Sequence, residues 1–163
     1  MGVYSQYMSS EGREALDKKF VGMLIYSIYK AIYKKLGDEA WDIVWESGRI
    51  FYDVLKEELK LKDEDSPQVI ISKISDFFKK MGYLKDVDVV KMDEEVIEFT
   101  IYSPITWNGN VKLRWEGMVP GQVLIPVLVA ALESKGYKVT RLKEREYGDK
   151  LLVERWKIVK PKK

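Results

Sequence analysis

In the first half of the chain, apolar residues recur at steps of three and four positions, which is the spacing of one face of an α-helix. This pattern predicts helices over residues 16–36, 38–59 and 67–81. Gly37 and Gly82 stand just past the first and the third of these helices, where glycine commonly ends a helix because it tolerates a positive φ. We therefore expect three consecutive helices.

After Gly82 the apolar period shortens to two, which is typical of strands with one buried face. Strands are predicted around residues 86–89 and 97–101, where Val, Ile and Phe alternate with acidic residues or threonine. Asn108-Gly109 predicts a two-residue hairpin turn, because both residues tolerate a positive φ. A third strand is expected to follow this turn.

A fourth helix is expected to begin at Pro120 and to be closed by Gly136. Two last strands, over residues 137–144 and 151–159, are predicted to meet at the turn pair Gly148-Asp149. Adjacent strands joined by tight turns form an antiparallel sheet. The expected fold class is α+β, with helices packed on one antiparallel sheet of about four to five strands in the order ααα-βββ-α-ββ.

Length and composition indicate one globular domain. The 163 residues are 46% hydrophobic and 33% charged, which is an ordinary balance for a globular protein. Residues 1–15 lack a sustained apolar period and are predicted to be an N-terminal arm, followed by a single domain over residues 16–163. Asn and Gln are scarce while Lys and Glu are plentiful, a composition typical of organisms that grow hot.

Two absent residue types exclude several kinds of chemistry. The chain contains no cysteine, which excludes disulfides, thiolate zinc sites and cysteine nucleophiles. It contains no histidine, which removes the usual general base near neutral pH and any Ser-His-Asp arrangement. We predict no catalytic residue, no metal ion and no cofactor. An enzyme that uses only carboxylates, tyrosine and lysine is left open, although no motif supports one.

Acidic residues cluster at two places, residues 63–65 and 93–95. Paired carboxylates act as catalytic groups in glycosidases and as ligands of hard cations. Clusters at loops and turns are far more often solvated, so we interpret both clusters as solvated surface residues. Neither a GxGxxG nor a GxxxxGK[ST] phosphate-binding motif occurs. The N-terminal end of the helix predicted from Pro120 is a weaker candidate for an anion site. The alternative is that it is an ordinary helix start.

The sequence contains neither a signal-peptide pattern at its start nor an apolar run of the about 18 residues that a membrane span requires. We therefore expect a cytoplasmic protein. Charge is uneven along the chain, because residues 135–163 carry a net charge of +7 and residues 1–134 a net charge of −5. A basic C-terminal hairpin could contact nucleic acid phosphates, but the alternative, a role in solubility, is preferred.

Aromatic residues form stripes at helical spacing, and the chain has five tryptophans and ten tyrosines. Trp41, Trp45 and Tyr52 lie at steps of four and seven on one predicted helix. Such a stripe fits either a helix–helix or dimer interface or the wall of an apolar ligand cavity. Pro126 is predicted to bend the helix that contains it, which would make that helix either a pocket wall or a buried helix with a tolerated kink.

Three short segments carry a family resemblance: residues 48–52 (Gly-Arg-Ile-Phe-Tyr), residues 118–124 (Met-Val-Pro-Gly-Gln-Val-Leu), and the closing hairpin with Gly136 and Gly148-Asp149. They resemble the 4-vinyl reductase-type domain, or hydrocarbon-binding protein family, which is related in fold to small subunits of the TRAPP vesicle-tethering complex. The resemblance implies a mixed α/β domain, often dimeric, with an apolar cavity between helices and sheet. Many members have cysteines in the closing hairpin, whereas residues 143–156 here have none, so no metal role is implied.

The leading functional hypothesis is a homodimeric domain that binds a small apolar or amphipathic molecule without turning it over. Arg49 is the candidate for meeting a ligand carboxylate or phosphate, with an intramolecular ion pair as the alternative. Other hypotheses are an oligomerisation module without ligand, and nucleic-acid binding through the C-terminal hairpin. The residues expected to line the cavity are Trp41, Trp45, Arg49, Phe51, Tyr52, Leu55, Met118, Gly121, Leu124 and Leu128.

Overall fold

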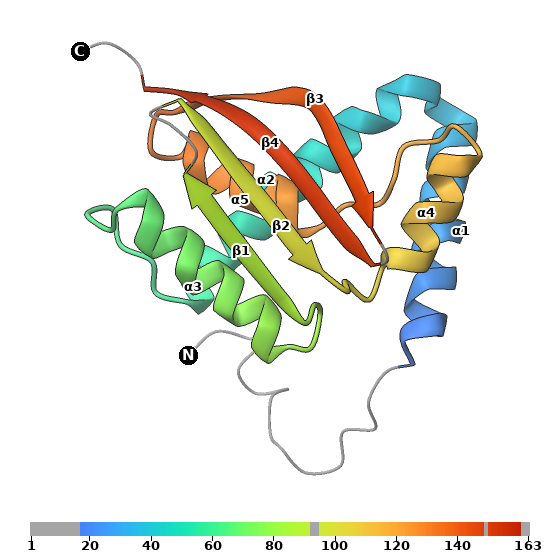
Figure 1. Ribbon diagram of the computed structural model, residues 1–163, viewed down its shortest axis with the longest axis horizontal. Helices are drawn as coiled ribbons and strands as arrows, with labels where there is room; N and C mark the ends of the chain where they lie inside the picture. The colour runs from blue at the N-terminus through green and yellow to red at the C-terminus, as the bar shows by residue number, and fades with distance from the viewer. Residues whose placement is uncertain (1–16, 92–94, 149, 161–163) are drawn as a thin grey trace.

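A computed structural model describes residues 17–91, 95–148 and 150–160 of the chain (Figure 1). The N-terminal arm predicted over residues 1–15 lies outside these residues, as do Asp149 and the last three residues, which include Lys162 and Lys163. The helices and strands are α1 (Lys18–Leu36), the 3-10 turn η2 (Gly37–Glu39), α2 (Ala40–Glu58), α3 (Pro67–Lys80), β1 (Asp86–Lys91), β2 (Val96–Tyr102), α4 (Trp107–Trp115), α5 (Leu124–Glu133), β3 (Lys138–Gly148) and β4 (Leu151–Val159).

The four described strands form one antiparallel sheet in the order β1-β2-β4-β3. The central pair joins β2 to β4, with Phe99 opposite Glu154, while β1–β2 and β3–β4 are hairpins. Helices α2 and α5 lie behind the sheet, α3 lies beside β1, and α1 and α4 stand together on the other side of the molecule (Figure 1). The predicted α+β class, helices packed on an antiparallel sheet, is confirmed.

One face of the sheet supplies half of the main core. Along β2, Ile97, Phe99 and Ile101 are buried and alternate with half-buried residues, as a period of two requires when only one face is covered. The helix that covers this face most completely is α5, whose residues from Leu124 to Leu132 are all buried. The main core is therefore a layer of apolar side chains between α5, α2, α3 and the sheet.

The three N-terminal helices form where the apolar period predicts them, and a side chain caps the start of α1 and the start of α3. The Asp17 carboxylate accepts a hydrogen bond from the Lys19 backbone N–H at the start of α1. Ser66 accepts one from the Val69 N–H at the start of α3, where proline occupies the first helical position. The agreement arises because apolar residues recur at helical spacing in each of them, although in α1 the apolar residues at that spacing (Phe20, Met23, Leu24 and Ile28) are exposed.

The prediction of a hairpin at Asn108-Gly109 is wrong, because both residues lie inside helix α4. Gly109 packs against the backbone of Gly22 in α1, where a Cβ at position 109 would overlap the Gly22 carbonyl oxygen and lie 3.3 Å from the Tyr26 nitrogen. Glycine is thus needed for close helix packing here and not for a turn. The third strand of the expected meander is absent from the described residues, and the element order is ααα-ββ-αα-ββ.

The prediction of a helix beginning at Pro120 is also wrong. Helix α5 begins at Leu124, so Pro126 is its third residue. The N–H that proline lacks would have no partner inside the helix at this position, so the physical reason for predicting a kink at Pro126 does not apply. The preceding segment is held in a non-helical form, because the Gln122 side chain donates a hydrogen bond of 2.8 Å to the buried Glu154 carboxylate on β4.

Candidate functional site

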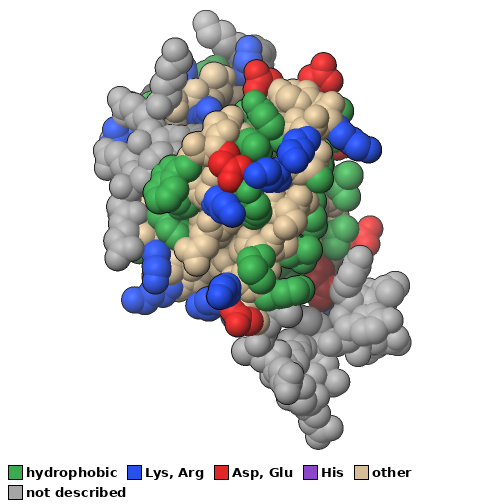
Figure 2. Space-filling model, turned by 90° about the vertical axis from the view of Figure 1, so that its right-hand side faces the viewer, with side chains coloured by type: hydrophobic (Ala, Val, Ile, Leu, Met, Phe, Trp, Pro, Cys, Tyr) green, Lys and Arg blue, Asp and Glu red, His purple; other side chains and the backbone are tan. Residues whose placement is uncertain are grey.

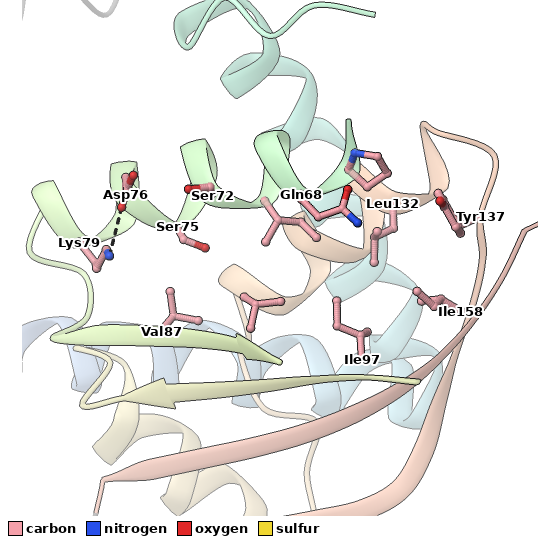
Figure 3. A pocket seen from close by; sticks show the side chains of 13 residues that line it. Gln68, Ser72, Ser75, Asp76, Lys79, Val87, Ile97, Leu132, Tyr137 and Ile158 are labelled. Atoms are coloured by element: carbon pink, nitrogen blue, oxygen red, sulfur yellow. Dashed lines mark ion pairs between the residues drawn. The ribbon is translucent and has the colours of Figure 1, made fainter. Parts of the chain in front are cut away.

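A groove of about 390 Å³ runs between α3 and the β1 side of the sheet (Figure 3). We call it the α3 groove. It exists because α3 packs its buried residues Ile70, Ile74 and Phe78 into the main core and leaves its neighbouring face apart from the strands. The residues that line it are Pro67, Gln68, Ile71, Ser72, Ser75, Asp76, Lys79, Val87, Val89, Ile97, Leu132, Tyr137 and Ile158.

The α3 groove is long and its walls are mainly apolar. Val87, Ile97 and Ile158 contribute from three strands, and Leu132 contributes from the end of α5. The α3 residues that line it extend from Pro67 to Lys79, and a helical rise of 1.5 Å per residue gives this wall a length of about 18 Å. These dimensions fit an extended chain better than a compact molecule.

Ser75 places one polar atom inside this apolar wall. Its side chain is 6% exposed, and its Oγ is buried without a hydrogen-bond partner. Figure 3 shows the side chain directed from α3 into the groove. A buried hydroxyl without a partner costs free energy, so its position suits a ligand atom that accepts or donates a hydrogen bond.

The two ends of the α3 groove differ in charge. At one end the Lys79 ammonium lies 3.1 Å from the Asp76 carboxylate and 3.5 Å from that of Asp86, and the hydrogen bond with Asp76 raises the pKa of Lys79. At the other end Tyr137 lies under the Lys160 ammonium, 5.9 Å from the ring centroid. The groove therefore has an end with excess acid and an end near a basic residue.

A second hollow, of about 520 Å³, lies between α2, α5 and strands β3 and β4. We call it the tryptophan groove. The rings of Trp41 and Trp45 stack with their centroids 6.1 Å apart, and Trp45 meets Trp156 edge to face at 5.6 Å. The residues that line this groove are Trp41, Trp45, Arg49, Pro126, Val129, Ala130, Glu133, Val139, Thr140, Arg141 and Trp156.

Arg49 makes two ion pairs within the chain. Its guanidinium lies 3.4 Å from the Glu46 carboxylate and 3.5 Å from that of Glu133. The side chain nevertheless stays 53% exposed at the rim of the tryptophan groove. The structure thus shows the ion-pair alternative for Arg49, and contact with a ligand stays a prediction, for which a weak, exposed ion pair leaves N–H donors.

The ten residues predicted from the sequence do not form one site. Trp41, Trp45 and Arg49 come together in the tryptophan groove. Two residues, Met118 and Gly121, lie near the smaller core cluster around Tyr29, between α1, α4 and α2. The other five lie in or against the main core, with no place in either groove: Phe51, Tyr52, Leu55, Leu124 and Leu128.

The sequence analysis does not predict the α3 groove. None of the thirteen residues that line it is among the ten predicted site residues. The one available signal is Ser75, a polar residue on the apolar face of a strongly amphipathic helix. Its neighbours Ile71 and Ile74 are buried, as the helical spacing indicates. A serine on that face marks a polar atom in an apolar wall, but the sequence does not show which strand lies opposite.

The acidic cluster at residues 63–65 makes local ion pairs and no metal site. Asp63 accepts a hydrogen bond from Lys56, which lowers the pKa of Asp63. The Lys62 backbone N–H and the Lys73 ammonium lower that of Asp65. Among the described residues no group of three or more acidic side chains could hold a metal ion. Asp93 and Glu94 lie outside the described residues.

Two further observations concern membranes and nucleic acids. Within the described part of the chain, no helix combines the length and the apolarity that crossing a bilayer requires. In the C-terminal hairpin, Arg155 pairs with Glu98 at 2.6 Å and Lys157 pairs with Glu95 at 3.0 Å. These pairs neutralise part of the positive charge that favours nucleic-acid binding.

Comparison with solved structures finds relatives in fold. Subunit 3 of the trafficking protein particle (TRAPP) complex from Naegleria fowleri, covalently bound to palmitic acid, superposes with a TM-score of 0.59 and 13% identity, over 88% of this chain and 95% of that one. An H-NOX domain studied for heme distortion superposes with a TM-score of 0.56 and 12% identity, over 89% of this chain and 72% of that one. A Cs H-NOX mutant that carries the unnatural amino acid 4-cyano-L-phenylalanine superposes with a TM-score of 0.56 and 11% identity, over 96% of this chain and 82% of that one.

The comparisons establish the fold and no closer relationship. No protein-family model and no curated protein matches the sequence. The expected relation in fold to TRAPP small subunits is confirmed. No match to a protein-family model supports the resemblance to the 4-vinyl reductase family.

Proposed function

We propose that this protein binds an elongated apolar or amphipathic molecule in the α3 groove, without catalysing its conversion. The observation that carries the proposal is the combination of a long apolar groove with the unpartnered Ser75 hydroxyl. Ligand sites are typically concave and mostly apolar, with a few polar groups that fix the orientation of the ligand. The α3 groove has this composition.

Proteins of the same fold support the proposal, since one is bound to palmitic acid and others are studied for their heme. Heme ligation by histidine is not available to this chain, which has none. An acyl or isoprenoid-like chain is the class that fits an apolar wall about 18 Å long. Its polar atom would meet Ser75.

Titration calorimetry and native mass spectrometry with 1-decanol and decanoate test this function. We expect 1:1 binding, and we expect Val89→Trp to weaken it at least tenfold, because Val89 lines the groove and the indole would fill it. The matched control is Val90→Trp, since successive residues of β1 point to opposite faces of the sheet. Absence of binding to the wild-type protein, or equal affinity in the Val89 and Val90 variants, would contradict the proposal.

We also propose that the protein forms a homodimer through α1. Four residues of this helix, Phe20, Met23, Leu24 and Ile28, are about half exposed and lie at steps of three and four, so they share one face. The opposite face of α1 packs on α4. Figure 2 views this side of the molecule, where exposed hydrophobic side chains lie among lysines and arginines. Exposed apolar residues gathered on one helix face are typical of an interaction surface.

Sedimentation velocity tests the dimer. The wild-type protein is expected to sediment as a dimer at micromolar concentration, and Leu24→Glu combined with Ile28→Glu is expected to give a monomer. Val69→Glu is the control, because Val69 is a comparably exposed apolar residue in the first turn of α3 and not part of α1. A wild-type monomer, or a dimer that survives the α1 changes, would contradict this interface.

A further inference from the structure

We propose that the tryptophan groove is a second ligand site, and that it takes a planar aromatic anion such as an aryl carboxylate or aryl phosphate. This site is separate from the α3 groove. The α3 groove opens along β1 and reaches β4 only at Ile158, whereas the tryptophan groove lies under β3, the opposite edge of the sheet. No residue lines both grooves.

Aromatic rings give the groove a flat surface and an edge. Trp41 and Trp45 are nearly parallel, with 18° between their planes, while Trp156 stands at 86° to Trp45. Aromatic pairs prefer such stacked and edge-to-face arrangements, and a further ring gains the same contacts. The surface therefore suits a planar ring better than a flexible chain.

Trp156 also presents a buried donor. Its side chain is 3% exposed, and its Nε1 has no hydrogen-bond partner. An indole N–H can only donate, so a ligand atom that satisfies it must be an acceptor. A carboxylate or phosphate oxygen is the strongest acceptor available to such a donor.

Two arginines give the groove a positive charge at its rim. Arg141 lies directly opposite Trp156 in the β3–β4 register, so the two side chains share one face of the sheet. The Arg141 guanidinium carbon is 5.2 Å from the centroid of the Trp41 ring. Arg49 also lies at the rim, where it pairs with Glu46 and Glu133. A guanidinium fork fits a carboxylate or a phosphate, so the Arg141 guanidinium beside the Trp41 ring favours an anion.

The experiment uses three probes of similar size: 2-naphthoate, its neutral analogue 2-naphthalenemethanol, and the non-aromatic anion decahydro-2-naphthoate. Titration calorimetry on the wild-type chain is expected to give submillimolar affinity for 2-naphthoate and at least tenfold weaker binding of the other two. No binding of 2-naphthoate at 1 mM, or equal affinity for all three probes, would overturn the proposal.

Variants then locate the binding. Arg141→Gln is expected to weaken 2-naphthoate about tenfold, whereas Lys138→Gln, which removes a charge from the same strand outside the groove, is expected to change affinity less than twofold. The Trp156 indole N–H resonance should shift downfield on binding in the wild-type protein, a readout that needs no substitution at this buried residue. Equal effects of the two charge changes, an unmoved Trp156 resonance, or loss of binding in Val89→Trp would contradict the assignment.

Discussion

Gly48 of α2 and Pro126 of α5 meet at backbone distance. A Cβ at position 48 would overlap the Pro126 side chain, and would lie 2.6 Å from its carbonyl carbon and 2.8 Å from its carbonyl oxygen. The two helices form the most extensive helix pair of the main core, and they approach this closely because position 48 has no side chain. The glycine next to Arg49 is therefore a packing requirement, which sets how α2 lies on α5.

Gly48→Ala is expected to lower the free energy of unfolding by about 1–3 kcal/mol, the usual cost of inserting a methyl group where no space exists. Gly109→Ala should have a similar effect, since its Cβ would overlap the Gly22 carbonyl. Urea unfolding followed by circular dichroism measures both changes.

Gly22→Ala is the matched control, because it is also a helical glycine at a helix crossing. A Cβ there would lie 3.5 Å from the Gly109 nitrogen and 3.7 Å from the Asn108 Cβ, which is ordinary contact. Since alanine favours a helix over glycine, this variant is expected to be more stable by about 0.5–1 kcal/mol. Equal destabilisation by the changes at positions 22 and 48 would contradict the packing described here.

Ser75→Ala is expected to leave the stability of the ligand-free protein unchanged or to raise it by up to about 1 kcal/mol. The Ser75 Oγ has no partner to lose, and the change removes a buried polar atom. The same change is expected to weaken 1-decanol binding several-fold, because the ligand hydroxyl loses its partner. Urea unfolding and titration calorimetry measure the two effects, and a loss of stability without loss of affinity would refute this role of Ser75.

The burial of Tyr83, which follows the C-terminal end of α3, can be tested by the pH dependence of stability. Burial raises the pKa of its phenol from the ordinary 10.0 to about 12, and its hydroxyl lies 3.1 Å from that of Thr106. In the unfolded chain the phenol loses its proton near pH 10, while the folded protein retains it. The stability that Tyr83 contributes is therefore complete below pH 10 and declines as the pH rises toward 12.

Tyr83→Phe is expected to cost about 1 kcal/mol at pH 8, the usual value of one hydrogen bond. The deficit relative to the wild-type protein should narrow between pH 10 and 11.5, an interval inside the range set by the two pKa values. Urea unfolding at several pH values measures this difference. A deficit that stays constant over the interval, or a Tyr83 phenol that ionises near pH 10 in the folded protein, would be inconsistent with its burial.

Lys30 and Glu116 connect α1 to the end of α4 at 2.7 Å. The hydrogen bond from Lys30 holds the pKa of Glu116 below its ordinary 4.5, and the same bond raises that of Lys30. Because the folded pKa of Glu116 is lowered, the stability from this pair is present above pH 4.5 and is lost as the pH falls through the lowered value.

A double-mutant cycle of Lys30→Gln and Glu116→Gln measures this coupling by urea unfolding. The coupling is expected to be favourable at pH 7 and to disappear in strong acid, and 1 M salt should reduce it at pH 7 because both side chains are exposed to solvent. A coupling that is equal at both pH values would show that the contact between α1 and α4 does not depend on charge.

The sequence predicts α1, α2 and α3 because apolar residues recur at helical spacing in each of them. It does not predict α4. Only Gly109 and Leu113 of α4 are buried, so this helix has almost no apolar period. The Asn-Gly pair then predicts a turn, although Gly109 serves the contact with Gly22. Here a contact between distant segments decides the conformation, and single-sequence patterns do not contain it.

The candidate sites show the same limit. Trp41 and Trp45 could be recognised because they recur at helical spacing, and they share one groove with Arg49, whereas Tyr52 of the same predicted stripe lies in the main core. The α3 groove is assembled from three strands and two helices, whose spacing depends on how the core residues pack. Phe51 and Leu55 have the same apolar character as groove residues, yet they fill the core, because burial depends on what lies opposite.

The position of β4 between β2 and β3 has a consequence for biosynthesis. On the ribosome, the three N-terminal helices and the β1–β2 hairpin emerge well before β4, yet β4 supplies the inner partner of β2. Until translation reaches Trp156, the nascent polypeptide has no complete platform on which α2 and α5 could close. The sheet can therefore be completed only after β4 has been translated, so a nascent chain that stops before β4 exposes the inner edge of β2.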